Sequence, residues 1–204
     1  EIRKFDTFEA KAVVANNAKL YFNREEGFVG FGLKKDEFIC DCSDIDDIIA
    51  FTDDGKMKVV RIADKVFIGK KILYAAVWKK EDERMTYHML YSDSKTGKAF
   101  AKRFNVTAIT RDKEYDLTQG NPKSKVWYFS ANPNSESEVI NIQLHPNAKA
   151  KIKIFDFDFG ELAVKGRSSM GNTVTKYALR KAVQKERGTS TLGGRKIWLD
   201  ETVG

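Results

Sequence analysis

The chain has few cysteines, prolines and histidines, and it has no long hydrophobic run. Of its 204 residues, two are cysteine, three are proline and two are histidine. So few cysteines exclude a disulfide-stapled scaffold and indicate a reducing, cytoplasmic compartment. The longest apolar run, Ile72–Trp78, has seven residues, whereas a membrane-spanning helix needs about 20. Residues 1–18 show no basic stretch followed by an apolar core, so we expect no secretory signal.

The composition is that of a folded protein. Apolar residues make up 42% and aromatic residues 12% of the chain, which argues against disorder. No Pro-, Gly- or Ser-rich linker divides the sequence, so we expect one domain with its own core. The chain opens on Glu1 rather than Met, and we expect it to be a fragment or a processed product.

The four residues that most often ligate soft metals do not form a motif. Cys40 and Cys42 are separated by one residue, so in a strand both would point to the same face, which suits a disulfide poorly. We expect them to be small apolar residues of a core strand. His88 and His145 are isolated in sequence, and we predict no metal site.

Short polar turns between β-branched and aromatic runs recur along the chain. Such turns, most of them ending in Gly, are typical of β-hairpins. Six candidate hairpins have turns near residues 26, 54, 96, 133, 159 and 200. The last three would join 126–129 to 139–142, 152–157 to 162–164, and 197–199 to the chain end. A repeated hairpin unit predicts a blade-like all-β architecture.

Helical patterns are weak. Residues 6–14 could form one short helix, and residues 176–186 fit neither the helical nor the strand period cleanly. We expect a strand for the second segment.

Two motifs resemble catalytic signatures but lack their essential partners. Asp158-Phe159-Gly160 spells the magnesium-binding triplet of protein kinases without the other kinase motifs, so we predict a hairpin turn there. The stretch from Gly166 to Gly171 has phosphate-loop spacing but no Lys after the second Gly. We therefore assign no catalytic residue and no metal ligand.

Positive charge is concentrated near the end of the chain. Residues 163–196 carry nine basic residues and one acidic residue, a net charge of +8, compared with +7 for the whole chain. Such a segment suits the phosphates of nucleic acids, although a solvated basic face would have the same composition. The predicted DNA-binding residues are Lys165, Arg167, Lys176, Arg180, Lys181, Lys185, Arg187, Arg195 and Lys196.

These features together resemble a known family, the C-terminal domain of the A subunit of bacterial type IIA topoisomerases, DNA gyrase and topoisomerase IV. The hairpin Asp47–Val59 resembles the repeating unit of that family, and the stretch Tyr21–Gly30 resembles its first blade hairpin. A Gly-Arg-x-x-x-Gly signature that recurs in the family is matched by residues 166–171, with Gly166 and Gly171 as the motif glycines.

The resemblance implies a β-pinwheel, a disc of five or six four-stranded blades that exchange strands with their neighbours. We expect residues 19–204 to form it and residues 1–18 to be a leading segment that packs against the disc or closes it. Gyrase carries a Gln-Arg-Arg-Gly-Gly-Lys-Gly box after its first blade hairpin, whereas residues 32–38 here read Gly-Leu-Lys-Lys-Asp-Glu-Phe. Residues 191–196 are a partial echo of the box. The resemblance therefore favours topoisomerase IV.

The function implied by the resemblance is non-specific binding and bending of duplex DNA for ATP-dependent strand passage by a parent enzyme. The catalytic residues, Mg²⁺ and ATP of the parent would lie outside this chain, which needs no cofactor itself. The expected partners are duplex DNA and, through the parent, the topoisomerase B subunit in an A2B2 heterotetramer. We expect a monomeric domain, associated with the nucleoid and with no membrane. The alternatives are a gyrase domain with a diverged box and a propeller-like platform for protein interactions.

Overall fold

The computed structural model describes residues 17–190, and they form an all-β structure of sixteen strands and two short 3-10 turns. The predicted all-β pinwheel class is confirmed. No helix among the described residues is long and apolar enough to cross a membrane. The predicted helix at 6–14, the predicted hairpin near 200, and Arg195 and Lys196 lie outside the described residues.

The strands form four small sheets. The first sheet has the order β3 (Glu37–Cys42), β1 (Ala18–Asn23), β2 (Phe28–Gly30), β6 (Val66–Phe67). The second sheet has the order β10 (Glu114–Asp116), β5 (Lys56–Arg61), β4 (Asp47–Thr52), β7 (Ile72–Trp78).

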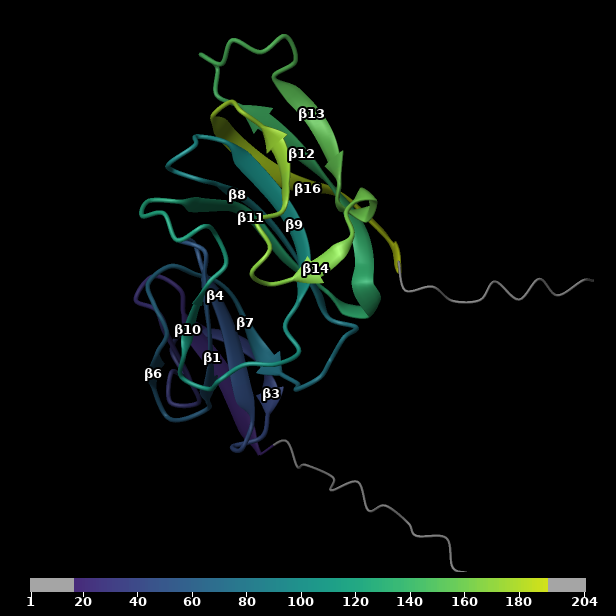
Figure 1. Ribbon diagram of the computed structural model, residues 1–204. Helices are drawn as coiled ribbons and strands as arrows, with labels where there is room; N and C mark the ends of the chain where they lie inside the picture. Colours follow the sequence, from purple (N-terminus) through teal and green to yellow (C-terminus); the bar gives the residue numbers. More distant parts are fainter. Residues whose placement is uncertain (1–16, 191–204) are drawn as a thin grey trace, which may run out of the picture.

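The third sheet has the order β11 (Lys125–Asn132), β8 (Thr86–Ser92), β9 (Ala99–Asn105), β14 (Val164–Gly166), and β15 (Asn172–Thr175) also pairs with β9. The fourth sheet has the order β13 (Ile154–Asp158), β12 (Glu136–Leu144), β16 (Leu179–Ser190). Figure 1 shows the sheets following one another from the first, at the bottom, to the fourth, at the top.

Neighbouring sheets exchange strands, as the resemblance implied. Strand β10 follows β9 in sequence but returns to pair with β5 of the second sheet. Strands β14 and β15 follow the β12–β13 hairpin but return to pair with β9 of the third sheet. Each returning strand ties two consecutive sheets together covalently, so the sheets cannot separate without breaking ladder hydrogen bonds.

The hairpins near 26, 54 and 96 are confirmed as β1–β2, β4–β5 and β8–β9. The hairpins near 133 and 159 are wrong. Strand β11 pairs with β8 while β12 pairs with β13 and β16, so the 3-10 turn Pro133–Ser135 joins two different sheets. The 3-10 turn Phe159–Glu161 likewise leads from β13 to β14 in the third sheet.

These two corrections also change the blade count. The described residues form four sheets instead of the predicted five or six, and the sheets hold three to five strands. A sheet-changing connection and a hairpin turn use the same polar and Gly residues, so a local pattern cannot distinguish them. The undecided segment 176–186 is confirmed as mainly strand, since β16 begins at Leu179.

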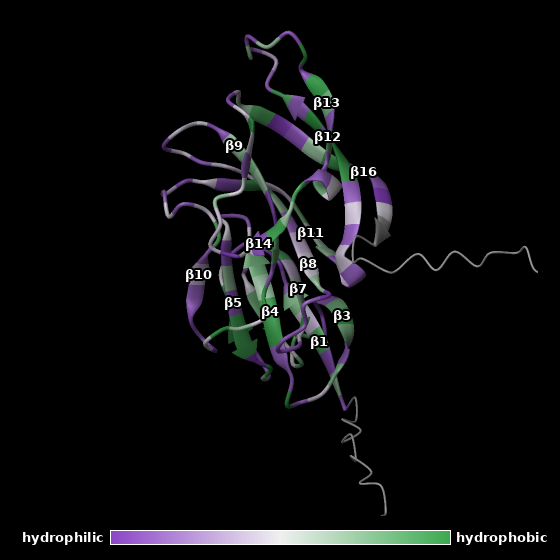
Figure 2. Cartoon of the chain, turned by 45° about the vertical axis from the view of Figure 1, so that its right-hand side comes forward, coloured by the Kyte–Doolittle hydropathy of each residue, from purple (hydrophilic) through white to green (hydrophobic). Residues whose placement is uncertain are grey.

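The core is built by strands whose alternate residues face different neighbours. In β4, Ile48 and Ala50 belong to the cluster shared with the first sheet, while Ile49 and Phe51 belong to the cluster shared with the third. Period-two alternation places successive side chains on opposite faces. A sheet covered on both faces therefore needs a nearly continuous apolar strand, which Figure 2 shows as the green stretch of β4.

The cysteines lie in β3, the edge strand of the first sheet, where they pack as small apolar residues. Cys42 is buried in the apolar cluster between the first two sheets, and Cys40 packs against it half-buried. Both thiols are free, and burial raises the pKa of Cys42 to about 11. This pKa keeps the thiol protonated and unreactive at neutral pH.

Candidate nucleic-acid interface

The predicted DNA-binding residues are divided between two sheets. Lys165 lies on β14 and Arg167 in the following loop, both at the edge of the third sheet. Lys176 precedes β16, and Arg180, Lys181, Lys185 and Arg187 lie on β16 of the fourth sheet. All of these side chains except that of Arg167 are exposed.

Arg167 does not behave as an exposed cation. Its guanidinium donates to the carbonyl oxygen of Ala108 at 2.7 Å and stacks over the Tyr115 ring, 4.4 Å from the centroid. The side chain is half-buried. The Arg167 guanidinium is therefore engaged by contacts with the rest of the fold.

A buried ammonium group on β9 anchors the loop that contains Arg167. Lys102 of β9 is only 2% exposed, and its Nζ donates to the carbonyl oxygens of Leu117 at 2.5 Å, Arg167 at 2.7 Å and Ser169 at 3.1 Å. Burial lowers the pKa of Lys102 to about 8, so the group stays charged at neutral pH. All three ammonium hydrogens can therefore be satisfied by backbone oxygens.

The second motif glycine has a steric reason. Gly171 has φ +92°, and a Cβ there would lie 2.5 Å from the carbonyl oxygen of Ala101. Only glycine permits this approach of the loop to β9. A Cβ at Gly166 would meet nothing within 4 Å. In this chain the Gly-Arg motif thus forms a loop that packs closely against β9 of the third sheet.

One of the predicted cations on β16, Lys185, is paired with a carboxylate. Lys185 Nζ lies 2.6 Å from Asp156 of β13, and this pairing lowers the pKa of Asp156. Arg187 lies opposite Glu138 of β12 in register, but its side chain is exposed whereas the Glu138 carboxylate is fully buried.

The other end of the fourth sheet carries cations without carboxylates. The loop between β12 and β13 is tied to the start of β16, because His145 N donates to the Ala178 oxygen at 2.8 Å and the Tyr177 hydroxyl to the Lys149 oxygen at 3.2 Å. This places two basic segments side by side. We call them the basic end of the fourth sheet, and its exposed cations are Lys149, Lys151, Lys153, Lys176, Arg180 and Lys181.

No acidic residue occurs within 143–155 or 172–183, the two segments that build the basic end. In register, Lys181 of β16 and Ile154 of β13 flank Gln143 of β12 on either side. At the opposite end of the same face, Glu186 and Asp158 flank Val139. The face therefore changes from basic to acidic along the strands, and a polyanion is favoured at one end only.

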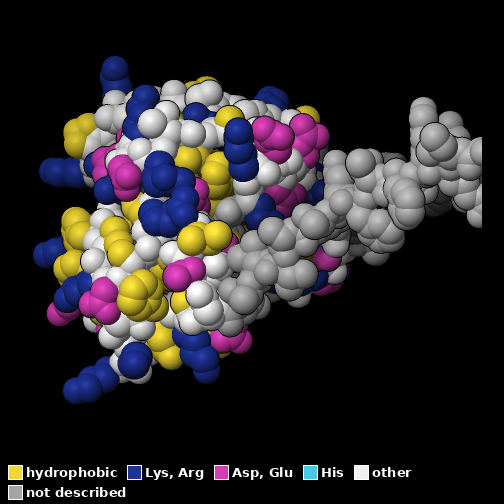
Figure 3. Space-filling view, turned by 90° about the horizontal axis from the view of Figure 1, so that it is seen from below, with side chains coloured by type: hydrophobic (Ala, Val, Ile, Leu, Met, Phe, Trp, Pro, Cys, Tyr) yellow, Lys and Arg dark blue, Asp and Glu magenta, His cyan; other side chains and the backbone are white. Residues whose placement is uncertain are grey.

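The predicted segment 163–196 missed half of this surface. Lys149, Lys151 and Lys153 lie outside it and are brought to β16 by the pairing of β12 with both β13 and β16. A sequence signal existed, since three lysines alternate with apolar residues over 149–154. By contrast, the face seen from below in Figure 3 intermixes basic, acidic and apolar side chains.

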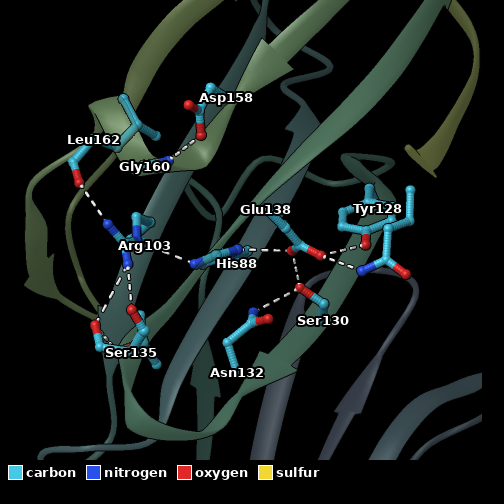
Figure 4. Close-up of polar contacts among 12 residues, drawn as sticks. His88, Arg103, Tyr128, Ser130, Asn132, Ser135, Glu138, Asp158, Gly160 and Leu162 are labelled. Carbon is cyan, nitrogen blue, oxygen red and sulfur yellow. Dashed lines mark hydrogen bonds and ion pairs between the residues drawn. The ribbon is translucent and has the colours of Figure 1, made fainter. Parts of the chain in front are cut away.

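The third and fourth sheets enclose a second charged group, shown in Figure 4. His88 of β8 and Glu138 of β12 are fully buried, and His88 Nδ1 lies 2.7 Å from Glu138 Oε1. The Arg103 Nε donates to His88 Nε2 at 3.1 Å. Because arginine can only donate, Nε2 must be the acceptor and Nδ1 must carry the proton, so the imidazole is neutral.

Glu138 has a full set of donors. Besides His88, its carboxylate accepts hydrogen bonds from Tyr128 at 2.8 Å, from Gln184 at 2.9 Å, and from Ser130. Despite burial, these partners lower the pKa of Glu138 to about 2. Burial lowers the pKa of His88. An ionised carboxylate and a guanidinium are thus joined through a neutral imidazole, in a site closed to solvent.

The titratable groups of this network are buried and cannot reach a substrate. A general acid or base must reach its substrate within hydrogen-bond distance, and Glu138 and His88 are both 0% exposed. We therefore interpret the network as an inter-sheet contact. Among residues 17–190, no group of three or more His, Cys, Asp or Glu side chains is placed to hold a metal ion.

Comparisons with known proteins agree with the resemblance drawn from the sequence. Residues 19–187 match a family described as the topoisomerase C-terminal domain of Bacteroidota. The chain is 29% identical over 172 residues to the A subunit of DNA topoisomerase 4 of Borreliella burgdorferi, an alignment that covers 84% of the chain and 26% of the relative. The chain therefore spans about a quarter of that relative's length.

A solved structure shows the same fold. The crystal structure of the C-terminal domain of DNA topoisomerase IV aligns with a TM-score of 0.50 at 13% sequence identity, covering 89% of this chain and 64% of that one. At this identity the likeness concerns the fold alone.

Proposed function

The chain belongs to the family of topoisomerase C-terminal domains of Bacteroidota, and from this premise we propose that it binds and bends duplex DNA without sequence preference. The observation that carries the proposal is the basic end of the fourth sheet, where six exposed cations gather without a carboxylate in either segment. Phosphates are the ligand class that such a surface attracts. No recognition helix is present in the described residues to read bases in the major groove.

The salt dependence of binding tests this proposal. If all six cations neutralise phosphates, log K plotted against log salt should slope by about −0.9 per contact, near −5 in total. Changing Lys149, Lys176, Arg180 and Lys181 to Gln should flatten the slope by about four contacts' worth. Affinity for unrelated duplexes of equal length should fall to a similar extent.

The matched control removes the same charge elsewhere. Lys70, Lys79, Lys95 and Lys98 are exposed, and changing them to Gln should leave most of the slope intact. Equal losses in both variants would show that only net charge matters. Weak, salt-insensitive association of the wild-type chain would favour the protein-interaction platform instead.

We assign no catalytic residue to this chain and propose that it serves a parent topoisomerase. In that assembly it would present DNA for ATP-dependent relaxation or decatenation, together with the B subunit in an A2B2 heterotetramer near the nucleoid. The Mg²⁺ and ATP sites and the nucleophile would belong to other parts of the parent. Purified chain incubated with supercoiled plasmid, Mg²⁺ and ATP should neither nick nor relax it.

One observation favours topoisomerase IV over gyrase as the parent enzyme. The gyrase box is absent from residues 32–38, which form the connection from β2 into β3. We therefore expect the chain to bend DNA while constraining little supercoiling. A plasmid relaxed in its presence should show a nearly unchanged linking number. A large positive shift would instead identify a gyrase domain with a diverged box.

A further inference from the structure

The loop from residue 145 to 153, between β12 and β13, exposes unusual apolar side chains. Ile152 is 68% exposed and Ile154, which begins β13, is 61% exposed. These are the two highest exposures among the large apolar residues of the described chain. In Figure 1 this loop stands out at the top of the molecule. The core does not explain two exposed isoleucines where this loop returns to β13.

The loop is held in shape by its own hydrogen bonds. Lys153 Nζ donates to the Pro146 oxygen at 2.5 Å, and Ala148 N donates to the His145 oxygen at 2.9 Å. Leu144 N donates to the Lys153 oxygen at 2.8 Å, which continues the β12–β13 ladder to the base of the loop. A preorganised loop loses little conformational entropy when it meets a partner.

The surroundings of the isoleucines favour one class of partner. Lys151 and Lys153 flank Ile152 directly, and Lys181 lies two strands from Ile154 in the same register row. Strands lie about 4.8 Å apart, so this ammonium group and the isoleucine can contact the same duplex. Apolar side chains between cations are the means by which architectural proteins wedge apart base steps and kink DNA.

We propose that Ile152, supported by Ile154, inserts into a base step of the duplex held by the basic end of the fourth sheet and thereby produces a kink. The inference rests on the proposed function and deepens it by assigning the bend to two side chains. Lysines supply the affinity through phosphates, and the isoleucines convert that affinity into deformation. The unstacking is offset by the additional phosphates that a bent duplex brings to the surface.

The experiment measures binding and bending separately on the same duplex of about 30 base pairs. Dyes at its two ends report the bend by energy transfer, and 2-aminopurine placed along it reports unstacked bases. For the wild-type chain we expect a bend and an increase in 2-aminopurine fluorescence. The double change Ile152→Ser and Ile154→Ser should reduce the bend by at least about 20° while affinity stays within about tenfold. The single change Ile152→Leu, which keeps an apolar side chain, should retain the wild-type bend.

The control is Ile45→Ser. Ile45 is 59% exposed and lies between Asp44 and Asp46, so it matches the exposure but not the charge. It should leave the bend and the fluorescence unchanged. If the wild-type chain does not bind duplex, the proposed function itself fails. If it binds but the serine variant bends DNA as the wild type does, the wedge is wrong and the two isoleucines serve a protein contact. Equal loss in the Ile45 variant would also overturn the wedge.

Discussion

The junction between the first and second sheets and the two junctions of the third sheet are built differently. Between the first and second sheets, the buried cluster consists of apolar side chains such as Leu20, Val29 and Ile48. The third sheet instead directs Lys102 toward the second sheet and Arg103, with His88, toward the fourth. Lys102 and Arg103 are neighbours in β9, so their side chains point to opposite faces.

The difference teaches how specificity enters a repetitive fold. Apolar faces are adaptable, because many arrangements bury the same area. A buried ammonium or carboxylate is tolerated only where its partners lie in the right places. The third sheet receives the returning strands β14 and β15 and anchors the Gly-Arg loop, so its neighbours are fixed by polar contacts as well as by packing.

The largest effect is expected for Glu138→Ala. The change leaves the donors of His88, Tyr128 and Gln184 without their acceptor and removes one of the two carboxylates, Asp158 and Glu138, that interact with the charge of Arg103. Removing one member of a buried charged set costs about 3–5 kcal/mol of the free energy of unfolding. Urea unfolding followed by circular dichroism would measure it. Glu186→Ala, on the exposed face of β16, is the control and should change stability little.

Lys102→Met should cost less, about 1–3 kcal/mol, since it leaves the Leu117, Arg167 and Ser169 oxygens unsatisfied without creating an unpaired charge. In the variant, the amides of residues 166–171 should exchange faster than in the wild type, while those of the first sheet should exchange at the wild-type rate. Equal protection of the loop in the variant and the wild type would contradict the role of the ammonium group. Lys98→Met, on the exposed turn before β9, provides the comparison.

Acid should weaken the polar junction. Because burial lowers the pKa of His88, the unfolded state binds a proton below about pH 6.5 that the folded state resists. The unfolded state then holds more protons. The free energy of unfolding therefore decreases as the pH is lowered, by at most about 1.4 kcal/mol per pH unit for one group. The pKa of Glu138, lowered from 4.5 to about 2, adds a further loss as the pH falls from about 4.5 to 2.

Unfolding in urea at pH 7, 6 and 5 would measure the His88 contribution. His88→Gln should flatten this pH dependence whatever its absolute stability. The control is His145→Gln, at the chain's other histidine, which is exposed and should leave the profile of the wild type. Stability independent of pH between 7 and 5 would show that the imidazole is not held neutral.

The smallest effect is expected at the apolar junction. Ile48→Val removes one buried methylene between the first and second sheets and should cost about 0.5–1.5 kcal/mol. Thermal unfolding would measure it. If this change lowered the free energy of unfolding as much as Glu138→Ala does, the apolar and polar junctions would not differ in the way proposed.

Much of the fold was predictable from local pattern. The alternation within β1–β2, β4–β5 and β8–β9, with a Gly-containing turn in each, determined three hairpins and the all-β class. The excess of basic residues near the end of the chain likewise marked 163–196 as a positively charged segment, whose described cations the structure divides between the third and fourth sheets. Both patterns are visible in the sequence because a strand's period and a segment's net charge are properties of consecutive residues.

The tertiary structure decided which strands meet. Only the pairing of β12 with both β13 and β16 brings Lys149 and Lys151 beside Lys176, and only the junctions of the third sheet join His88 to a carboxylate fifty residues away. It also brought the Arg167 guanidinium against the Ala108 oxygen and the Tyr115 ring. Such pairings depend on which sheet a strand enters after a turn, a choice made by the burial of whole faces and by buried charges finding partners, and turn residues carry no record of it.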